Sequence, residues 1–169
     1  MVELVEAHRG PVFGLCYRML RHRQDAEDVT QESFVRALRS LRNWDSQREF
    51  LPWLLAIAGN RCRTLLAARM RRPAMSSLIE HPGDNAQQLV QARNLAEEVD
   101  LALGRLRVEY RQAFVLFHQQ ELSYAEISDA MQCPLGTVKT WVHRARCELI
   151  AILKERGVVE EVRHAVRRI

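Results

Sequence analysis

The strongest constraint on the fold lies in residues 122–146, which read LSYAEISDAMQCPLGTVKTWVHRAR. Ser123 and Glu126 form an S-x-x-E capping box, so a helix is predicted to begin directly after Ser123. Pro134 has no amide hydrogen to donate and Gly136 relaxes the backbone, so a break is predicted here. A second helical pattern follows the break. The stretch therefore predicts two helices joined by a tight turn.

The second of these helices is predicted to have an apolar side and a basic side. The residues that recur at helical spacing, and that we expect to face the first helix, are Val138, Val142, Ala145 and Leu149. The opposite side has no acid and consists of Lys139, Thr140, His143, Arg144 and Arg146. This arrangement predicts a DNA-binding helix-turn-helix, because a helix fits the major groove and such side chains donate to bases and phosphates.

The beginning of the second helix adds a phosphate-binding prediction. Gly136 and Thr137 stand there, and backbone amides without a partner can hold a phosphate at a helix N-terminus. The alternative is an ordinary helical hairpin whose basic outer face meets only solvent. The capping box, the break, the apolar spacing and the basic face together favour DNA binding.

The composition indicates a folded, all-helical protein. The chain has 169 residues, 47% hydrophobic and 27% charged, which suffices for one ordinary domain or two small ones. Gly and Pro are few, and runs of alternating polarity rich in β-branched residues are absent. No apolar run approaches the roughly 20 residues of a membrane span, and the amino terminus lacks the pattern of a signal peptide. We expect a cytoplasmic protein that does not insert into membranes.

Two helical blocks are separated by residues 73–88, which contain two Pro, one Gly and several small polar residues. We therefore predict two small helical domains at 1–72 and 92–156, a flexible linker at 73–91 and a tail at 157–169. A buried stripe of the second block is predicted to consist of Leu95, Val99, Ala102 and Leu106. His118 is expected to be a partly buried histidine beside this apolar surface.

One helix of the first block is predicted to begin at Asp25, a good N-cap residue. Its buried stripe at helical spacing is predicted to be Thr30, Phe34, Ala37, Leu38 and Leu41. The opposite face carries Asp28, Gln31, Glu32 and Arg36. On the pattern alone, this face is interpreted as a solvated surface.

A later helix of the first block begins as core and ends as a basic rod. Its inward stripe is predicted to be Phe50, Trp53, Leu54, Ile57 and Ala58. The basic residues that follow, with no acid among them, are Arg61, Arg63, Arg69, Arg71 and Arg72. This charge pattern favours phosphate binding. The alternative is a solubilising helix end, although solvated faces usually mix signs of charge.

No catalytic residue, metal site or cofactor is predicted. The four cysteines have no metal-ligand spacing and are expected to be small buried or half-buried side chains: Cys16, Cys62, Cys133 and Cys147. A glycine-rich phosphate loop and a nucleophile motif are absent. His8, His22 and His81 are expected in loop-like or surface positions without a partner.

Three motifs in this order resemble the extracytoplasmic-function sigma factors of bacterial RNA polymerase: DAEDVTQESFVRAL, FLPWLLAIAGNRCR and the stretch at 122–146. The resemblance covers residues 4–154. It implies that the acidic helix docks on the clamp-helix coiled coil of the polymerase largest subunit, and that the second lobe meets the flap. The docking residues would be Asp25, Asp28, Gln31, Glu32 and Arg36. An anti-sigma protein that wedges between the lobes is an implied partner.

The resemblance also implies the two contacts with promoter DNA. The loop at 44–50 and the helix from Asn60 onward would read and open the −10 element through Trp44, Phe50, Asn60, Arg61, Arg63 and Arg69. Trp53 is expected to be core rather than a platform for a base. The second lobe would bind the −35 duplex through Gly136, Thr137, Lys139, Thr140, His143, Arg144 and Arg146. The alternative function is a free-standing helix-turn-helix regulator that binds operators as a dimer.

Overall fold

The computed structural model describes residues 2–71 and 89–158, and within them it contains α-helices, one short 3₁₀ helix and no strand. The all-α prediction is confirmed. Most of the predicted linker and tail lies outside the described residues, as does His81. The last three residues predicted as linker, 89–91, already belong to a helix.

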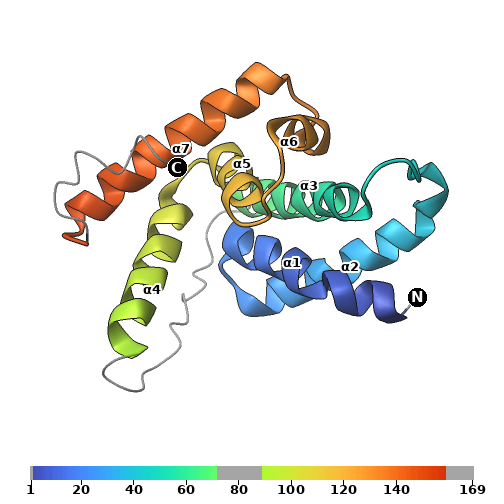
Figure 1. Cartoon of the computed structure of the whole chain (residues 1–169). Coiled ribbons are helices and arrows are strands. Elements are labelled where there is room, and N and C mark those ends of the chain that lie inside the picture. The colour runs from blue at the N-terminus through green and yellow to red at the C-terminus, as the bar shows by residue number, and fades with distance from the viewer. Residues whose placement is uncertain (1, 72–88, 159–169) are drawn as a thin grey trace.

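The first lobe is a bundle of three helices (Figure 1). They are α1 (Val2–Leu20), α2 (Arg23–Arg39) and α3 (Phe50–Arg71), with the 3₁₀ helix η1 (Leu41–Asn43) after α2. Leu15 and Met19 of α1 and Leu54 of α3 are fully buried, and Phe34 of α2 joins the same core. Burial of each such side chain stabilises the fold by about 1.5–3 kcal/mol.

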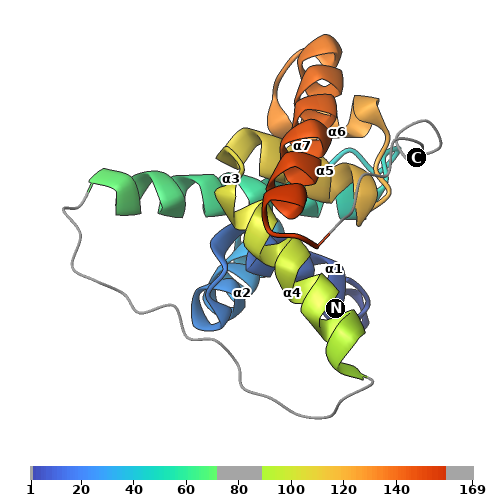
Figure 2. The ribbon, with the colours of Figure 1, turned by 90° about the vertical axis from the view of Figure 1, so that its left-hand side faces the viewer.

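The second lobe contains the helix-turn-helix. Its helices are α4 (Leu89–Arg105), α5 (Val108–His118), α6 (Tyr124–Met131) and α7 (Leu135–Glu155). The carboxyl-terminal half of α7 packs on α4, and Leu103 and Tyr110 are buried there with Ala145 and Leu149. In Figure 2, α7 and α4 lie at the front of the molecule.

The capping box at the start of α6 is confirmed. The Glu126 amide donates to Ser123 Oγ at 3.2 Å, and the Ser123 amide donates to the Glu126 carboxylate at 2.7 Å. The turn after α6 differs from the prediction. Gln132, at φ 53°, adopts the left-handed conformation, while Gly136 already lies within α7. Gln132 tolerates this conformation because its amide satisfies helix-end carbonyls, those of Ser128 and Asp129.

The two lobes pack against each other. Helix α6 of the second lobe lies on α3, and α5 lies on α1, as both ribbon views show (Figures 1 and 2). One continuous apolar core runs across this boundary, and it includes Leu15 and Leu55 of the first lobe with Leu116 and Ile127 of the second. The prediction of two helical units is confirmed, and the structure joins them into one packed body.

Three details of the predicted helices are wrong. Helix α2 begins at Arg23, because Nδ1 of His22 accepts the amide hydrogen of Asp25 and so caps the helix three residues before the predicted cap. Leu38 is 39% exposed because it lies on the side of α2 away from its neighbours. Leu95 is 50% exposed, since this end of α4 projects past the rest of the lobe (Figure 1).

Two histidines differ from the prediction, one in its position and one in having a partner. His8 lies within α1 and not in a loop, and its ring centroid is 5.5 Å from that of Phe50. His22 is exposed, as expected, and it has a partner because its ring contacts the Asp25 carboxylate at 2.8 Å. Cys16 and Cys62 are buried and Cys133 is half-buried, as predicted, whereas Cys147 is exposed.

Candidate nucleic-acid interface

An aromatic cluster stands where the loop at 44–49 meets α3. The ring of Phe50 has its centroid 5.4 Å from that of Trp44, with the two rings nearly perpendicular, and 5.5 Å from that of Trp53. Trp44 and Phe50, both predicted site residues, therefore come together. The indole N–H of Trp44 is buried without a hydrogen-bond partner. Trp53 is half-buried and contributes to this cluster as well as to the core.

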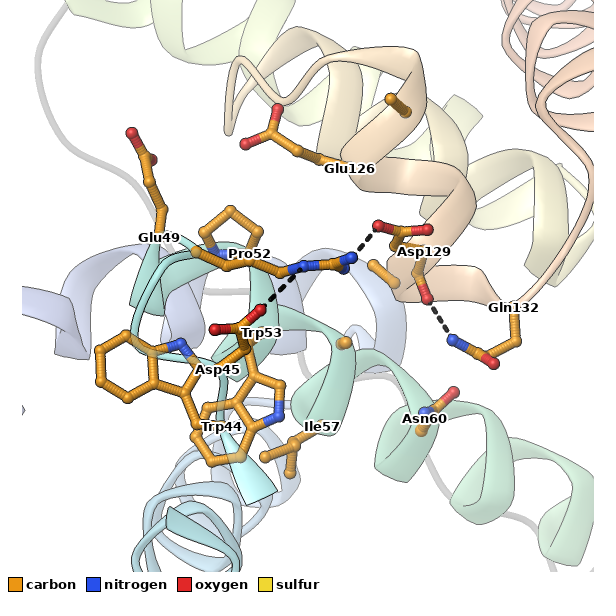
Figure 3. A pocket seen from close by; sticks show the side chains of 14 residues that line it. Trp44, Asp45, Glu49, Pro52, Trp53, Ile57, Asn60, Glu126, Asp129 and Gln132 are labelled. Atoms are coloured by element: carbon orange, nitrogen blue, oxygen red, sulfur yellow. Dashed lines mark hydrogen bonds and ion pairs between the residues drawn. The ribbon is translucent and has the colours of Figure 1, made fainter. Parts of the chain in front are cut away.

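A pocket of about 850 Å³ opens beside this cluster (Figure 3). Trp44, Trp53 and Asn60 line it from the first lobe, and Asp129 and Gln132 line it from α6 of the second. The close-up shows the two indole rings on one side and the polar side chains of α6 on the other. Asn60, predicted to hydrogen-bond a base, is exposed at this pocket.

The basic end of α3 is not as free of acids as its own sequence indicates. Arg61 donates to the Glu32 carboxylate at 2.6 Å, and Arg69 pairs with Asp25. Arg63 donates to the side-chain oxygen of Asn60. The acids belong to α2, which packs beside α3. Because α2 and α3 are separate segments of the sequence, the residues of α3 alone did not indicate these ion pairs.

Glu32 has two cationic partners. Hydrogen bonding to Arg61, followed by that to Arg36, lowers the pKa of the Glu32 carboxyl from its ordinary value. Arg36 Nη2 lies 2.8 Å from the carboxylate. Of the predicted polymerase-binding residues, Asp28, Gln31 and Arg36 are exposed, while Asp25 and Glu32 are half-buried in ion pairs.

Sequence reasoning missed two apolar residues on the outer side of α2. Val35 is 45% exposed and Leu38 is 39% exposed, and both lie among the polar residues predicted to bind polymerase. The signal was present in the sequence, because Val35 follows Gln31 by four residues and so shares its helix face.

Helix α7 presents much of the predicted DNA-binding face to solvent. Lys139, Thr140, His143 and Arg144 are exposed. The predicted apolar side is buried, with Val138, Val142, Ala145 and Leu149 each less than a tenth exposed. The Thr140 hydroxyl donates to the Gly136 carbonyl at 2.9 Å, and the Lys139 ammonium lies 5.8 Å from the Tyr124 ring centroid.

Arg146 and Thr137 lie otherwise than predicted. Arg146 is half-buried, with its guanidinium 5.6 Å from the Phe117 ring centroid and its Nε donating to Nε2 of His118 at 2.9 Å. It turns inward because α5 offers an aromatic surface beside it. The Thr137 amide donates to the Pro134 carbonyl at 2.9 Å, so a phosphate would compete with that bond.

Two further side chains of this region have defined partners. Arg144 Nη1 donates to the hydroxyl of Tyr110 at 3.2 Å, which holds its side chain near the surface of α5. His118 is partly buried as predicted, against the rings of Phe114 and Phe117. Burial, and then the Arg146 charge, lower the pKa of the His118 imidazole below its ordinary value.

Within residues 2–71 and 89–158, no group of three or more His, Cys, Asp or Glu side chains is arranged to hold a metal ion. No helix in the same residues combines the length and apolar character that a membrane crossing requires.

Comparison with known proteins matches both lobes. The family model described as sigma-70 region 2 matches residues 4–72, and that described as sigma-70, region 4 matches residues 96–149. The ECF RNA polymerase sigma factor SigW of Bacillus subtilis is 32% identical over 158 residues, covering 85% of this chain and 83% of that protein. The RNA polymerase sigma-H factor of Pseudomonas aeruginosa is 34% identical, covering 85% and 80%.

Solved structures match the fold as well. The sigma factor RpoE of Bartonella quintana, in complex with the anti-sigma factor NepR, has a TM-score of 0.74 at 21% identity, covering 90% of this chain and 95% of that one. CnrH, in complex with the cytosolic domain of CnrY, has a TM-score of 0.67 at 28% identity, covering 90% and 86%. Because both sigma-70 regions match in order and the relatives align over most of both chains, this protein belongs to the extracytoplasmic-function sigma factors of RNA polymerase.

Proposed function

We propose that this sigma factor directs core polymerase to promoters by binding the −35 element as duplex through α7 and by reading and melting the −10 element through the loop at 44–49 and α3. The observation that carries this proposal is the two-sided character of α7. Lys139, Thr140, His143 and Arg144 are exposed on one side, while the opposite side is buried in the lobe. A rigid helix with an exposed basic face fits the major groove.

The −10 contact is assigned to the aromatic pocket and the arginines of α3. Melting needs a place for an unstacked base, and aromatic rings provide about 1–3 kcal/mol of stacking per base. Trp44 and Phe50 supply rings, and Asn60 supplies an amide that can pair with a base edge. The backbone phosphates would be held by Arg61, Arg63 and Arg69. In this assignment Arg61 and Arg69 exchange carboxylate partners for phosphates.

Polymerase docking is assigned to the exposed side of α2, from Asp28 and Gln31 to Arg36, with Asp25 and Glu32 at its edge. Its partner would be the clamp helices of the largest subunit, and the second lobe would contact the flap. The functional units would be residues 1–72 and 92–156. All of these roles are binding roles, and no side chain is assigned a catalytic one.

An anti-sigma factor is the proposed regulatory partner. One of the matched structures is a sigma factor bound to its anti-sigma factor, and this chain aligns with that sigma factor over nine-tenths of its length. We place the protein in the cytoplasm, where polymerase acts. The alternative, a free-standing dimeric regulator, leaves the first lobe without a role, although that lobe matches sigma-70 region 2.

The test is transcription with purified core polymerase on a template pool whose −35 and −10 positions are randomised. Sequencing the transcripts should return two conserved blocks separated by about two turns of DNA. The double variant Lys139→Ala with Arg144→Ala should lose the −35 block and keep the −10 block. Transcripts no more abundant than with core polymerase alone, from a folded protein, would refute the proposal. A dimer that binds duplex tightly without polymerase would favour the regulator.

A further inference from the structure

Two aromatic side chains of the second lobe stack where α5 ends and α6 begins. The ring centroids of Phe117 and Tyr124 are 4.6 Å apart, and the ring planes differ by 17°. Stacked rings of this kind attract each other when they are offset. Both rings are half-buried and pack against the core. Each ring of this aromatic pair is therefore partly held by the core and partly open to solvent.

The backbone between the two helices determines how the rings meet. The connection from α5 to α6 folds back on itself, because the Leu122 amide donates to the Leu116 carbonyl at 3.1 Å. Leu122 is buried, so this connection is anchored in the core. The capping box of Ser123 and Glu126 then forms the first turn of α6, in which Tyr124 is the first residue. These local contacts hold Tyr124 beside α5.

Helix α7 places a cation beside each ring of the aromatic pair. The Lys139 ammonium lies 5.8 Å from the Tyr124 ring centroid, and Cζ of Arg146 lies 5.6 Å from that of Phe117. The two cations are seven residues apart in the sequence, which is close to two helical turns, so they share one side of α7. A cation within about 6 Å of a ring centroid is attracted by the electron-rich face of the ring.

The two cations differ in what else holds them. Arg146 is half-buried, and its Nε donates to Nε2 of His118 at 2.9 Å, so its side chain is committed to the lobe. Lys139 is exposed, and the Tyr124 ring is the contact that the structure gives its ammonium. Lys139 is therefore the cation of the two that remains available to a ligand.

A lysine on the proposed reading face gains from being held in place. Its flexible four-carbon stem loses conformational freedom when the ammonium binds an anion. A ring that already attracts the ammonium restricts the stem before binding, so less freedom is lost on binding. The ring of Tyr124 has no net charge, unlike the Glu32 carboxylate beside Arg61. It therefore orients the cation without neutralising it.

We propose that Tyr124, stacked on Phe117, is a positioning residue that holds the Lys139 ammonium toward a phosphate of the −35 duplex. Tyr124 belongs to the first helix of the helix-turn-helix, which crosses the DNA backbone in this motif. The first helix thereby acts on a charge that α7 presents. This inference rests on the proposed −35 role of α7 and extends it to a residue of α6.

The test changes the charge distribution of the ring and keeps its shape. Two replacements are made in the full chain, Tyr124→Phe and the incorporation of pentafluorophenylalanine at Tyr124. Fluorine withdraws electron density from the face of the ring, so the fluorinated ring no longer attracts a cation. It still stacks on Phe117, because a fluorinated ring and an ordinary ring have opposite quadrupoles. Fluorescence anisotropy then measures binding of the holoenzyme to a −35 duplex chosen from the sequenced transcripts.

Tyr124→Phe should match the parent, because the electron-rich face is retained. Pentafluorophenylalanine at Tyr124 should weaken binding about two- to fivefold, the range that an exposed cation–π contact provides. The same replacement in the Lys139→Ala background should leave binding unchanged, because the cation that the ring positions has been removed. A loss of equal size in both backgrounds would overturn the inference, since Tyr124 would then act through packing alone.

Phe114 is the matched control. It is a half-buried ring of α5, and within the residues that the structure describes no Lys or Arg lies over it. Pentafluorophenylalanine at Phe114 should leave the affinity for the duplex unchanged. If it weakens binding as much as the replacement at Tyr124 does, the effect belongs to fluorination of the lobe and the inference fails.

The outcomes distinguish this inference from the proposed function. If Lys139→Ala weakens binding but pentafluorophenylalanine at Tyr124 does not, the −35 role of α7 stands and the positioning role of Tyr124 is refuted. If Lys139→Ala leaves binding to the duplex unchanged, the proposed contact of Lys139 with DNA fails, and the inference fails with it.

Discussion

The Nε atom of Arg61 lies 2.6 Å from the Glu32 carboxylate, which joins the helix assigned to DNA to the helix assigned to polymerase. Arg69 and Asp25 form a second connection between the same two helices. The charges of the two proposed surfaces are therefore partly satisfied by each other in the free chain. Polymerase and promoter would each replace one partner of these pairs.

Glu32→Gln should lower the free energy of unfolding at neutral pH by about 0.5–1 kcal/mol, because it removes the charge that pairs with Arg61 and Arg36. The pKa of Glu32 is lowered in the folded chain from 4.5. Its contribution is therefore fully present above that value and is lost as the pH falls through the lower folded pKa. Denaturant unfolding of parent and variant between pH 7 and pH 3 measures this.

Glu27→Gln is the control for this prediction. Glu27 is as exposed as Glu32, with 35% of each side chain accessible, but among residues 2–71 and 89–158 it pairs only with the exposed Arg23 on its own helix. If Glu27→Gln lowers the free energy of unfolding as much as Glu32→Gln does, the contact of Glu32 with Arg61 on α3 adds no stability.

Asp28→Arg should reduce retention on core polymerase at least tenfold, because it places a cation on the proposed docking face in place of an acid. Asp28 is exposed, and within the part of the chain that the structure describes its side chain accepts only a long hydrogen bond, 3.4 Å from Gln24, so the melting temperature should change little. Glu97→Arg makes the same charge change on exposed α4 and should alter retention less than twofold. Retention of Asp28→Arg equal to that of Glu97→Arg would contradict the docking assignment.

Lys139→Ala should weaken binding of the holoenzyme to a −35 duplex. It should also reduce the slope of the logarithm of the binding constant against the logarithm of the salt concentration by about 1, the value for one phosphate contact. Lys154→Ala, near the end of the same helix and also exposed, is the control and should leave the salt dependence unchanged. Fluorescence anisotropy over a salt series measures both. Identical slopes for the two variants would exclude a Lys139 phosphate contact.

Arg146→Ala should act on stability rather than on DNA, because Arg146 is half-buried between Phe117 and His118. We expect about 1 kcal/mol less unfolding free energy. The pKa of His118 should also rise, since the Arg146 charge contributes to its depression. An imidazole with a lowered folded pKa stabilises the fold above its unfolded value of 6.5, and this contribution is lost as the pH falls below it. NMR titration of His118 in both proteins checks the shift.

The helices and the helix-turn-helix could be predicted because local rules decide them. The capping box at Ser123 and the apolar spacing from Val138 to Leu149 are both present in the structure. Boundaries were less predictable, as α2 shows, since Asp25 and His22 can both accept a helix amide hydrogen, and in the structure His22 is the cap. The exposure of Leu38 depended on which side of α2 met its neighbours.

The candidate site was predicted residue by residue and not as a surface. Arg61, Arg63 and Arg69 have no acid among them in the sequence, yet α2 places Glu32 and Asp25 beside two of them. Arg146 has the spacing of a DNA-facing residue, but its guanidinium packs on the ring of Phe117 in α5. No sequence pattern indicated the ion pair of Asp129, because its partner Arg48 is 81 residues away in the chain.

Periodicity, caps and turn residues act over a few neighbouring positions, so the order of residues alone was enough for the helix-turn-helix, for the helices observed as α2 and α3, and for the family resemblance. Pairings between helices depend on distances that no short stretch of sequence contains. Only the packed structure brings Glu32 to Arg61, Gln112 to Gly59 and Asp129 to Arg48. Burial then decides whether each charge is available to a partner, because an arginine already bonded to a carboxylate must leave it before it can hold a phosphate.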